Sequence, residues 1–366
     1  MKFSIITVCY NSANTIEQTI QSVLSQQYSD LEYIVVDGGS TDGTSNVIEK
    51  YRQEIAVYIS EPDRGLYDAM NKGIGRASGD VIAFLNSDDW YAAGTLDKVR
   101  RYFEYNDPDI VSGSMYMWTE KICSKYGVER HNRENVFFES IYPQPALFVK
   151  RKLYLQMGGF DLSYKIAADT KWIMNAYVQG ADILCVDDCF TYFRYGGIST
   201  VKEYEALEEQ YRAALECLRG QGQRQLEEKI SAFYIPELHR MKKVKGKEYF
   251  REALVNKRTE VRELFDYSTR YYIWGIGMRG ALCLDIFETL ELPIVGFIDS
   301  YAKQRRIAGY PVILPEKINA GYKICITPKN YEEEIIGQLK DMGVAEDRYF
   351  TYFDMFEKIA ELGEGE

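Results

Sequence analysis

The most informative chemistry in this chain lies where an apolar stretch ends in a group of polar side chains. Residues 81–85 are almost all apolar, as in a strand covered on both faces, and Asn86, Ser87, Asp88 and Asp89 follow directly. Ligands of open parallel sheets bind at this carboxyl end of the strands. Carboxylates suit Mg²⁺ or Mn²⁺, ions that also bind substrate phosphates. Because Ser and Asp also form turns and cap helices, a structural turn is the alternative interpretation.

The elements that must position these acids are strands alternating with helices. This spacing predicts right-handed crossovers and an α/β fold with a mostly parallel sheet. The first helix opens at Asn14, where Glu17 three residues later completes a capping-box pattern. Asp37 directly follows the second strand and therefore falls at the same sheet edge as Asp88 and Asp89. Strands are predicted over 3–8, 31–36, 57–60 and 81–85, and helices over 14–24, 45–53, 66–74 and 92–102.

Five motifs in this order resemble the family 2 glycosyltransferases of GT-A fold. The resemblance spans residues 4–172 and is closest to the branch that elongates bacterial surface polysaccharides. It implies a nucleotide-sugar donor, with UDP as the expected nucleotide, and a saccharide acceptor that is often lipid-linked. The motifs are SIITVCYN (4–11), IVVDGGSTDGT (34–44), EPDRGLYDAMNKGI (61–74), GDVIAFLNSDD (79–89) and GGFDLSYKIAADTKW (158–172).

The resemblance also implies which positions hold the nucleotide. The backbone near Val8 and Tyr10, together with the Asp37 carboxylate, would hold the nucleobase and ribose. Asp63 and Asn71 match the part of the family pattern that lines the nucleotide pocket. For Asp37, capping of a turn is the structural alternative.

The phosphate and metal positions follow from the same resemblance. Arg64 and Lys72 are candidate diphosphate contacts on the strength of charge alone, and a solvated charge is the favoured interpretation of Lys72. Asp88 would lie near the ribose or the metal, and Asp89 would be the metal ligand proper. Asn86 stands where many relatives carry the first acid of a D-x-D motif, so the site has one carboxylate fewer.

Asp169 is the candidate general base. It lies just before a predicted helix over 171–178 and matches the acid that serves as base in the family, in which case the reaction would invert the anomeric centre. Ala168 replaces the Glu of the more widespread E-D version, and an Asp at a helix start is also a good cap. Arg194 lies in a segment, 194–199, that resembles a family closing segment, where a guanidinium could meet the diphosphate; an ordinary surface turn is the alternative.

Composition narrows the class of protein. The 366 residues allow two or three domains, and 46% apolar content is ample for buried cores. A net charge of -11 argues against a nucleic-acid surface. The seven cysteines show no paired CxxC spacing and are expected to be reduced thiols. We expect neither a signal peptide nor a membrane span, and therefore a cytoplasmic protein.

We expect a glycosyltransferase domain of GT-A fold over 1–200, a helical linker region over 201–262 and a Rossmann-like module over 263–366. The middle region is helical and highly charged, with a break at residues 220–222 and a locally basic part beyond it. A lipid-linked acceptor would make this part a peripheral contact with the inner membrane face, although a solvated helix face is the simpler interpretation. Its basic residues are Arg240, Lys242, Lys243, Lys245, Lys247, Arg251, Lys257 and Arg258.

The last region carries a dinucleotide fingerprint. A predicted strand over 271–274 precedes Gly275, Gly277 and Gly280 in a G-x-G-x-x-G turn, and Asp299 follows a second strand about 20 residues later. Because residues 323–327 form the only further clear strand, we expect roughly half of a Rossmann domain. It resembles the small Rossmann-like modules attached to sugar-modifying and transferase enzymes, so a bound nucleotide is one interpretation and simple packing is the other.

The preferred function is an inverting, metal-dependent glycosyltransferase that uses Mn²⁺ or Mg²⁺. A nicotinamide-dependent sugar oxidoreductase centred on residues 275–299 is one alternative, either alone or as a second activity. It is weakened because no catalytic Tyr-x-x-x-Lys follows in this short unit. A noncatalytic sugar-nucleotide binding protein is the other alternative, and it predicts binding without turnover.

Overall fold

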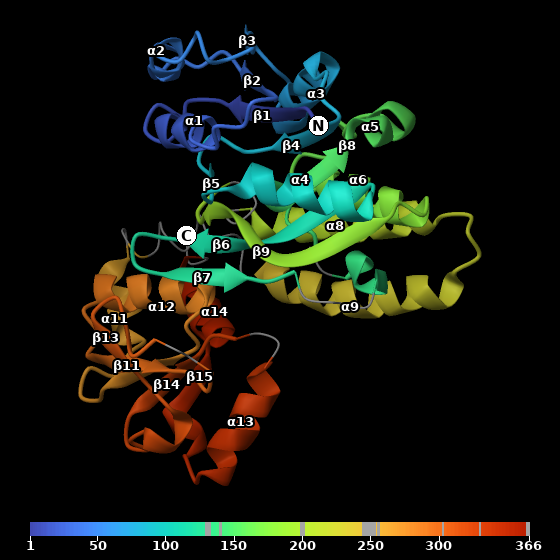
Figure 1. Cartoon of the computed structure of the whole chain (residues 1–366). Coiled ribbons are helices and arrows are strands. Elements are labelled where there is room, and N and C mark those ends of the chain that lie inside the picture. The colour runs from blue at the N-terminus through green and yellow to red at the C-terminus, as the bar shows by residue number, and fades with distance from the viewer. Residues whose placement is uncertain are drawn as a thin grey trace. The chain divides into compact units, whose positions relative to one another are not determined.

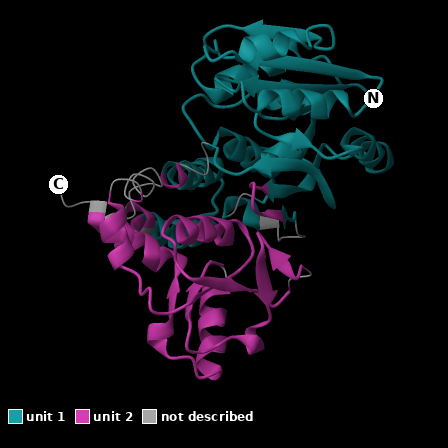
Figure 2. Cartoon of the chain, turned by 90° about the vertical axis from the view of Figure 1, so that its left-hand side faces the viewer, with its two compact units in different colours: residues 1–117, 125–200, 205–238 teal, residues 118–124, 201–204, 239–366 magenta. Residues whose placement is uncertain are grey.

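The computed structural model divides the chain into two compact units (Figure 2). The first comprises residues 1–117, 125–200 and 205–238, and the second comprises 118–124, 201–204 and 239–366. The domain bounds expected from the sequence stay a prediction. The residues that the structure describes are 1–128, 133–138, 141–197, 202–243, 254, 257–301, 304–328 and 331–363.

The first unit is built on a nine-stranded mixed sheet, which confirms the predicted α/β class. Four strands form its parallel half in the order β3-β2-β1-β4. The later strands extend this half through antiparallel pairs, beginning where β8 pairs with β4. The parallel strands are β1 (Phe3–Cys9), β2 (Leu31–Asp37), β3 (Val57–Ser60) and β4 (Val81–Phe84), and the others are β5 (Trp90–Tyr91), β6 (Ile110–Trp118), β7 (Cys123–Tyr126), β8 (Leu147–Lys150) and β9 (Ile183–Arg194).

Helices cover both faces of this sheet, which is why the parallel strands are apolar at nearly every position. Successive residues of a strand point to opposite faces. In β1, Ile6 packs in one core cluster with Met70, whereas Ile5 packs in a second cluster with Val23. The helices are α1 (Ile16–Leu24), α2 (Thr44–Glu49), α3 (Leu66–Arg76), α4 (Thr95–Asn106), α5 (Arg151–Met157), α6 (Ala168–Val178), α8 (Glu203–Leu218) and α9 (Arg224–Lys243), with short 3₁₀ turns at Arg133–Phe137 and Gln144–Ala146.

Several helix starts differ from the sequence prediction by a few residues, and two of these differences concern side chains named above. The capping box is wrong: α1 begins at Ile16 without a side-chain cap, because the Glu17 carboxylate accepts hydrogen bonds from Tyr51 and Lys50 instead. Helix α6 begins at Ala168, so Asp169 lies in its first turn rather than before the helix.

The predicted helical region contributes to the core of the first unit. Helices α8 and α9 lie side by side (Figure 1), and the rings of Tyr211 and Tyr234 stack between them at 5.4 Å. The chain breaks between them at residues 219–223, as the glycines at 220 and 222 indicate. Of the basic residues named above, Lys245, Lys247 and Arg251 lie outside the described residues. Within the described part of the chain, none of the helices combines the length and apolar character that crossing a membrane requires.

The second unit contains a larger parallel sheet than the sequence indicates. Five parallel strands run in the order β13-β11-β10-β14-β15, which is the 3-2-1-4-5 order of a doubly wound nucleotide-binding fold. The expectation of half a Rossmann domain was therefore wrong. The strands are β10 (Tyr271–Trp274), β11 (Ile294–Ile298), β12 (Arg306–Ile307), β13 (Tyr310–Ile313), β14 (Lys323–Ile326) and β15 (Tyr349–Thr351), and the helices are α11 (Arg258–Glu263), α12 (Met278–Thr289), α13 (Glu332–Asp341) and α14 (Tyr352–Gly363), with 3₁₀ turns at Pro315–Lys317 and Glu346–Arg348.

Gly280→Ala should destabilise the second unit by about 1–3 kcal/mol, the usual cost of overpacking. A Cβ at this position would lie 2.2 Å from the carbonyl oxygen of Gly275, because α12 approaches the end of β10 closely. Gly277→Ala is the matched control, since a Cβ there would meet no atom within 4 Å. Urea unfolding of the full chain measures the difference, and equal stability of the two variants would contradict this packing.

Candidate active site

The loops at the carboxyl edge of the parallel strands are bonded to one another. After β1, the Asn11 side chain accepts a hydrogen bond from the Thr41 amide at 2.9 Å, in the loop after β2. The hydroxyls of Ser12 and Ser87 are 2.8 Å apart, which joins the first loop to the loop after β4. The carboxylates that follow β4 are therefore held in a connected surface built from three strand ends.

Asp89 is almost completely buried at this edge, with 1% of its surface exposed. Its Oδ1 accepts a hydrogen bond from the Arg194 backbone amide at 2.9 Å, at the end of β9. Its backbone carbonyl accepts another from the Thr19 hydroxyl at 2.7 Å. Its Oδ2 has no hydrogen-bond partner, and neither does the buried Oδ1 of Asn86. Two acceptor oxygens of one four-residue loop are thus buried without a donor.

Burial shifts the titration of both acids. It raises the pKa of Asp89 well above its ordinary value, and the neighbouring charge of Asp88 raises it further. Burial also raises the pKa of Asp88, while the Arg194 guanidinium opposes this shift. A carboxylate that is buried without enough donors is costly unless a cation compensates its charge.

These oxygens fit a hard divalent cation in part. The unpartnered oxygens of Asp89 and Asn86, together with Asp88, are the donor type that Mg²⁺ or Mn²⁺ takes. Among the described residues, no group of three or more His, Cys, Asp or Glu gathers that could hold a metal. An ion here would therefore depend on other ligands as well, and Mg²⁺ typically combines one or two carboxylates with waters and substrate phosphates.

Arg194 lies at this loop, and its contact with a diphosphate stays a prediction. Its Nε donates to the Asp88 carbonyl at 3.2 Å, and its Nη2 donates to the Gln18 side chain at 2.8 Å. The guanidinium lies 5.2 Å from the centre of the Trp90 ring, which stacks on Tyr192 at 5.1 Å. The stacked rings of Trp90 in β5 and Tyr192 in β9 therefore hold the Arg194 guanidinium beside Asp88 and Asp89.

Asp37 is fully buried, and its carboxylate is occupied within the protein. Oδ1 accepts from the Ser40 hydroxyl at 2.5 Å, and Oδ2 accepts from the Ser60 hydroxyl at 2.7 Å. This arrangement fixes the turn after β2. Nearby, Val8 is buried in the sheet and the Tyr10 side chain is 63% exposed. A nucleobase contact by these residues stays a prediction.

Asp63 and Asn71, the two predicted pocket residues near α3, make different contacts. Asp63 lies against the backbone after β2, where a Cβ on Gly38 would be 2.3 Å from its Oδ2. Asn71 instead bonds both to the amide of Phe160 at 2.7 Å and to its carbonyl at 2.8 Å. Its amide is therefore used to hold the turn before α6.

Two predicted phosphate contacts are paired with acids in the structure. The Arg64 guanidinium lies 3.0 Å from Asp68, and the Lys72 ammonium lies 2.9 Å from Glu61. Each pair has one exposed partner, Arg64 in the first and Glu61 in the second, and ion pairs that solvent reaches in this way are usually weak. Lys72 also donates a hydrogen bond to the Pro62 carbonyl at 3.0 Å.

Asp169 is joined to the same sheet edge through α3. Its Oδ1 accepts a hydrogen bond from the Tyr67 hydroxyl at 2.8 Å, and Tyr67 stands at the start of α3, just after the loop that follows β3. Burial raises the pKa of Asp169, and the Tyr67 hydrogen bond opposes this shift. A carboxylate with a raised pKa is a stronger base than an exposed one.

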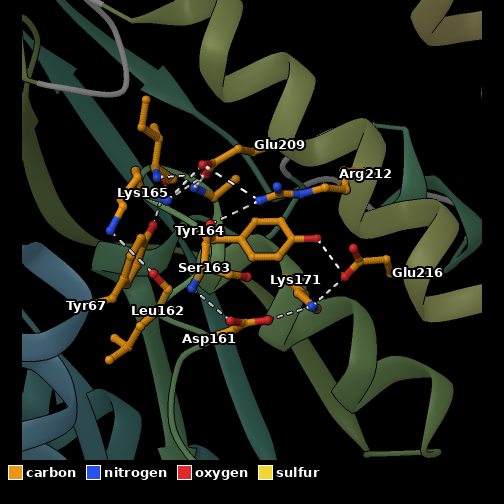
Figure 3. Close-up of polar contacts among 12 residues, drawn as sticks. Tyr67, Asp161, Leu162, Ser163, Tyr164, Lys165, Lys171, Glu209, Arg212 and Glu216 are labelled. Atoms are coloured by element: carbon orange, nitrogen blue, oxygen red, sulfur yellow. Dashed lines mark hydrogen bonds and ion pairs between the residues drawn. The ribbon is translucent and has the colours of Figure 1, made fainter.

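Sequence reasoning missed two residues that contact this segment. Tyr67 shares helical spacing with Met70 and Ile74, so its position on the buried face could have been recognised. Glu209 of α8 accepts hydrogen bonds from the backbone amides of residues 165–167 (Figure 3). No local pattern identifies Glu209, because its partners lie more than 40 residues away in the sequence.

The fingerprint glycines of the second unit lie where β10 meets α12. Gly275 follows β10, Gly277 precedes the helix, and Gly280 packs against the Gly275 carbonyl. Asp299 follows β11, and its Oδ1 accepts a hydrogen bond from the Tyr301 amide at 2.8 Å. The turn therefore has the strand, helix and acid that a dinucleotide site uses. A nucleotide at this turn stays a prediction.

The sheet and the acid loop define the class of protein: a GT-A fold with its polar residues at the carboxyl edge. S. aureus TarS 1–349 in complex with UDP has the same fold, with a TM-score of 0.51 and 22% identity over 64% of this chain and 71% of that chain. Residues 4–162 match the family described as Glycosyl transferase family 2, and residues 267–350 match C2185-like, N-terminal.

Sequence relatives establish the family. An uncharacterised glycosyltransferase of Mycobacterium tuberculosis is 31% identical over 203 residues, which cover 50% of this chain and 72% of the relative. A PGL/p-HBAD biosynthesis glycosyltransferase of Mycobacterium bovis is 32% identical over 178 residues, which cover 47% and 68% respectively. The chain belongs to the family 2 glycosyltransferases and is a glycosyltransferase enzyme, as the sequence motifs predict.

Asp89→Asn should raise the melting temperature of the metal-free chain at neutral pH. The asparagine removes a buried charge and keeps an oxygen for the Arg194 amide. Because folding raises the pKa of Asp89, the stability that this acid contributes is complete below its unfolded-state pKa of about 4 and declines as the pH rises. The gain should therefore grow as the pH rises above about 4, as measured by thermal unfolding with EDTA.

Asp187→Asn provides the opposite control for this measurement. Asp187 is exposed, and its ion pair with Lys125 lowers its pKa, so removing its charge should not stabilise the chain. A melting temperature of Asp89→Asn that is unchanged or lower at neutral pH would show that burial of this charge is not costly.

Proposed function

We propose that this chain is an inverting, metal-dependent glycosyltransferase. It moves a sugar from a nucleotide-diphosphate donor to a hydroxyl of a glycan or lipid-linked saccharide in surface polysaccharide synthesis. The observation that carries the proposal is the buried Asp89 carboxylate, which has one unpartnered oxygen beside Asp88 and the Arg194 guanidinium. Such a site is suited to a cation and the negatively charged diphosphate that the cation would hold.

Asp88 and Asp89 would hold Mn²⁺ or Mg²⁺, and the Asn86 oxygen is available as a further ligand. When bound, this ion stabilises the charge that develops on the leaving diphosphate. Arg194 adds a fixed positive charge on the same side, because its guanidinium is stacked on Trp90. Arg64 and Lys72 would contribute once they leave their ion pairs with Asp68 and Glu61.

The nucleoside would lie across the loops after β1 and β2. The backbone near Val8 and Tyr10 faces this edge, and Asp63 lies against the backbone at Gly38. Asp37 would support the pocket by fixing the turn in which Ser40 lies. UDP is the first nucleotide to test, because the TarS structure contains it.

Asp169 would remove the proton from the attacking acceptor hydroxyl. Its raised pKa, caused by burial, suits a group that accepts a proton near neutral pH. With one base and no covalent intermediate, the acceptor attacks opposite the leaving group, so the anomeric configuration inverts. The reaction would occur in the cytoplasm, with a lipid-linked acceptor bringing the enzyme to the inner membrane face.

A screen of nucleotide-sugars with Mn²⁺, Mg²⁺ or EDTA tests the activity. We expect release of the nucleoside diphosphate only with a divalent ion, and at least about 100-fold less with EDTA, given the several kcal/mol that such an ion supplies. Asp89→Asn should lose this response to Mn²⁺. Binding of UDP without turnover of any donor would favour a noncatalytic role, and full activity in EDTA would exclude the metal.

Asp169→Asn should lower kcat by about 10²–10⁴-fold, the usual contribution of a general base. Its affinity for UDP, measured by calorimetry, should remain nearly that of the unchanged chain, because Asp169 is not placed among the nucleotide contacts. Asp161→Asn is the matched control, since Asp161 lies nearby but forms an ion pair with Lys171. Native transfer by Asp169→Asn would show that another group is the base.

A further inference from the structure

The segment that carries Asp169 is held from two directions by side chains outside it (Figure 3). On one side, the Glu209 carboxylate of α8 accepts hydrogen bonds from the backbone amides of Lys165, Ile166 and Ala167 at 2.8–3.0 Å. Hydrogen bonds to a charged acceptor are about twice as strong as neutral ones. Three consecutive amides ending two residues before Asp169 are thus fixed by one carboxylate.

On the other side, the Tyr67 hydroxyl lies between two acceptors. It is 2.5 Å from the Ile166 carbonyl oxygen and 2.8 Å from Oδ1 of Asp169. A phenol has one hydrogen to donate. When Asp169 is ionised, the hydroxyl can donate to its carboxylate. When Asp169 is protonated, the acid can donate to the phenol oxygen while the phenol donates to the Ile166 carbonyl. The hydroxyl therefore serves both protonation states of the acid.

We propose that Tyr67 and Glu209 are the positioning residues of Asp169. Glu209 fixes the backbone that presents the Ile166 carbonyl, and Tyr67 bridges that carbonyl and the Asp169 carboxylate through its single hydroxyl. This inference rests on the proposed role of Asp169 as the base. Neither residue needs to contact the substrate, because each acts on the orientation and proton affinity of Asp169.

The titratable groups around Asp169 support the positioning roles of Tyr67 and Glu209. The titratable groups that face Asp169 include Tyr67 from α3, Tyr154 from α5 and Glu209 from α8. The Glu209 charge raises the pKa of Asp169, and the Tyr67 hydrogen bond lowers it. Tyr67 is 4% exposed, so water does not replace its hydroxyl easily.

The Tyr67 contact is tested by an NMR titration of the full chain labelled with ¹³C at the aspartate carboxyls, with Asp169→Asn assigning the signal. Tyr67→Phe should raise the pKa of Asp169 by about one pH unit, because the hydrogen bond that Tyr67 makes to the ionised acid is stronger than the one it makes to the protonated acid. Tyr164→Phe is the matched control, because that hydroxyl donates to Glu216 instead. An unchanged pKa in Tyr67→Phe, or an equal shift in the control, would overturn the proposal.

The Glu209 contact is tested by hydrogen exchange and kinetics. Glu209→Gln should speed amide exchange at residues 165–167 by about tenfold or more and lower kcat, with the affinity for UDP unchanged. Glu216→Gln is the control on the same helix, since Glu216 bonds to the Lys171 and Tyr164 side chains rather than to backbone amides. Equal exchange in both variants, or a loss confined to UDP affinity, would contradict a positioning role.

The proposal that Asp169 is the base and the proposal that Tyr67 and Glu209 position it can fail separately. The NMR titration and the exchange measurement need no turnover, so they report on Tyr67 and Glu209 even if Asp169 is not the base. Native transfer by Asp169→Asn would remove the base assignment, whereas a null result in Tyr67→Phe and Glu209→Gln, with Asp169→Asn inactive, would remove only the positioning role.

Discussion

The hydrogen bond between the Asp89 carboxylate and the Arg194 amide joins the two halves of the large sheet at the site. Asp89 follows β4, the last parallel strand, whereas Arg194 ends β9 in the antiparallel half. These residues are 105 positions apart in the sequence. The rest of the edge depends on this contact, because it places the guanidinium beside the acids and leaves one carboxylate oxygen without a donor. A carboxyl group with an unpartnered oxygen and a raised pKa is buried here, and such groups are typical of functional sites.

The parts of the fold that could be predicted are those in which local pattern and burial agree. Strands β1, β2 and β4 carry apolar residues on both faces, and in the structure these residues are buried in a core cluster on each face of the sheet. Helix ends were less predictable, because the Glu17 side chain has a stronger option in Tyr51 than in a capping box. Strands β13 and β15 were missed since they are short and only partly buried, and β13 contains a proline.

The acids of the site could be predicted because their positions at strand ends are a local property. Their surroundings could not. Asn71 bonds to the backbone of Phe160, 89 residues away, and Asp37 bonds to the hydroxyl of Ser60, 23 residues away. Glu209 shows the same limit, because its partners become neighbours only when α8 packs on the first unit. Long-range contacts decide which polar residues remain available to a ligand.

Asp63 packs so closely against Gly38 that the space available at one position limits the residue at the other. A single methyl group at position 38 would fall inside the Asp63 carboxylate. Homologues that carry a larger residue at position 38 should therefore have a smaller or displaced residue at position 63. Side-chain volume would then be redistributed between the two loops as the sequences diverge. The rim of the proposed nucleotide pocket would then change shape among family members without any change in the sheet beneath it.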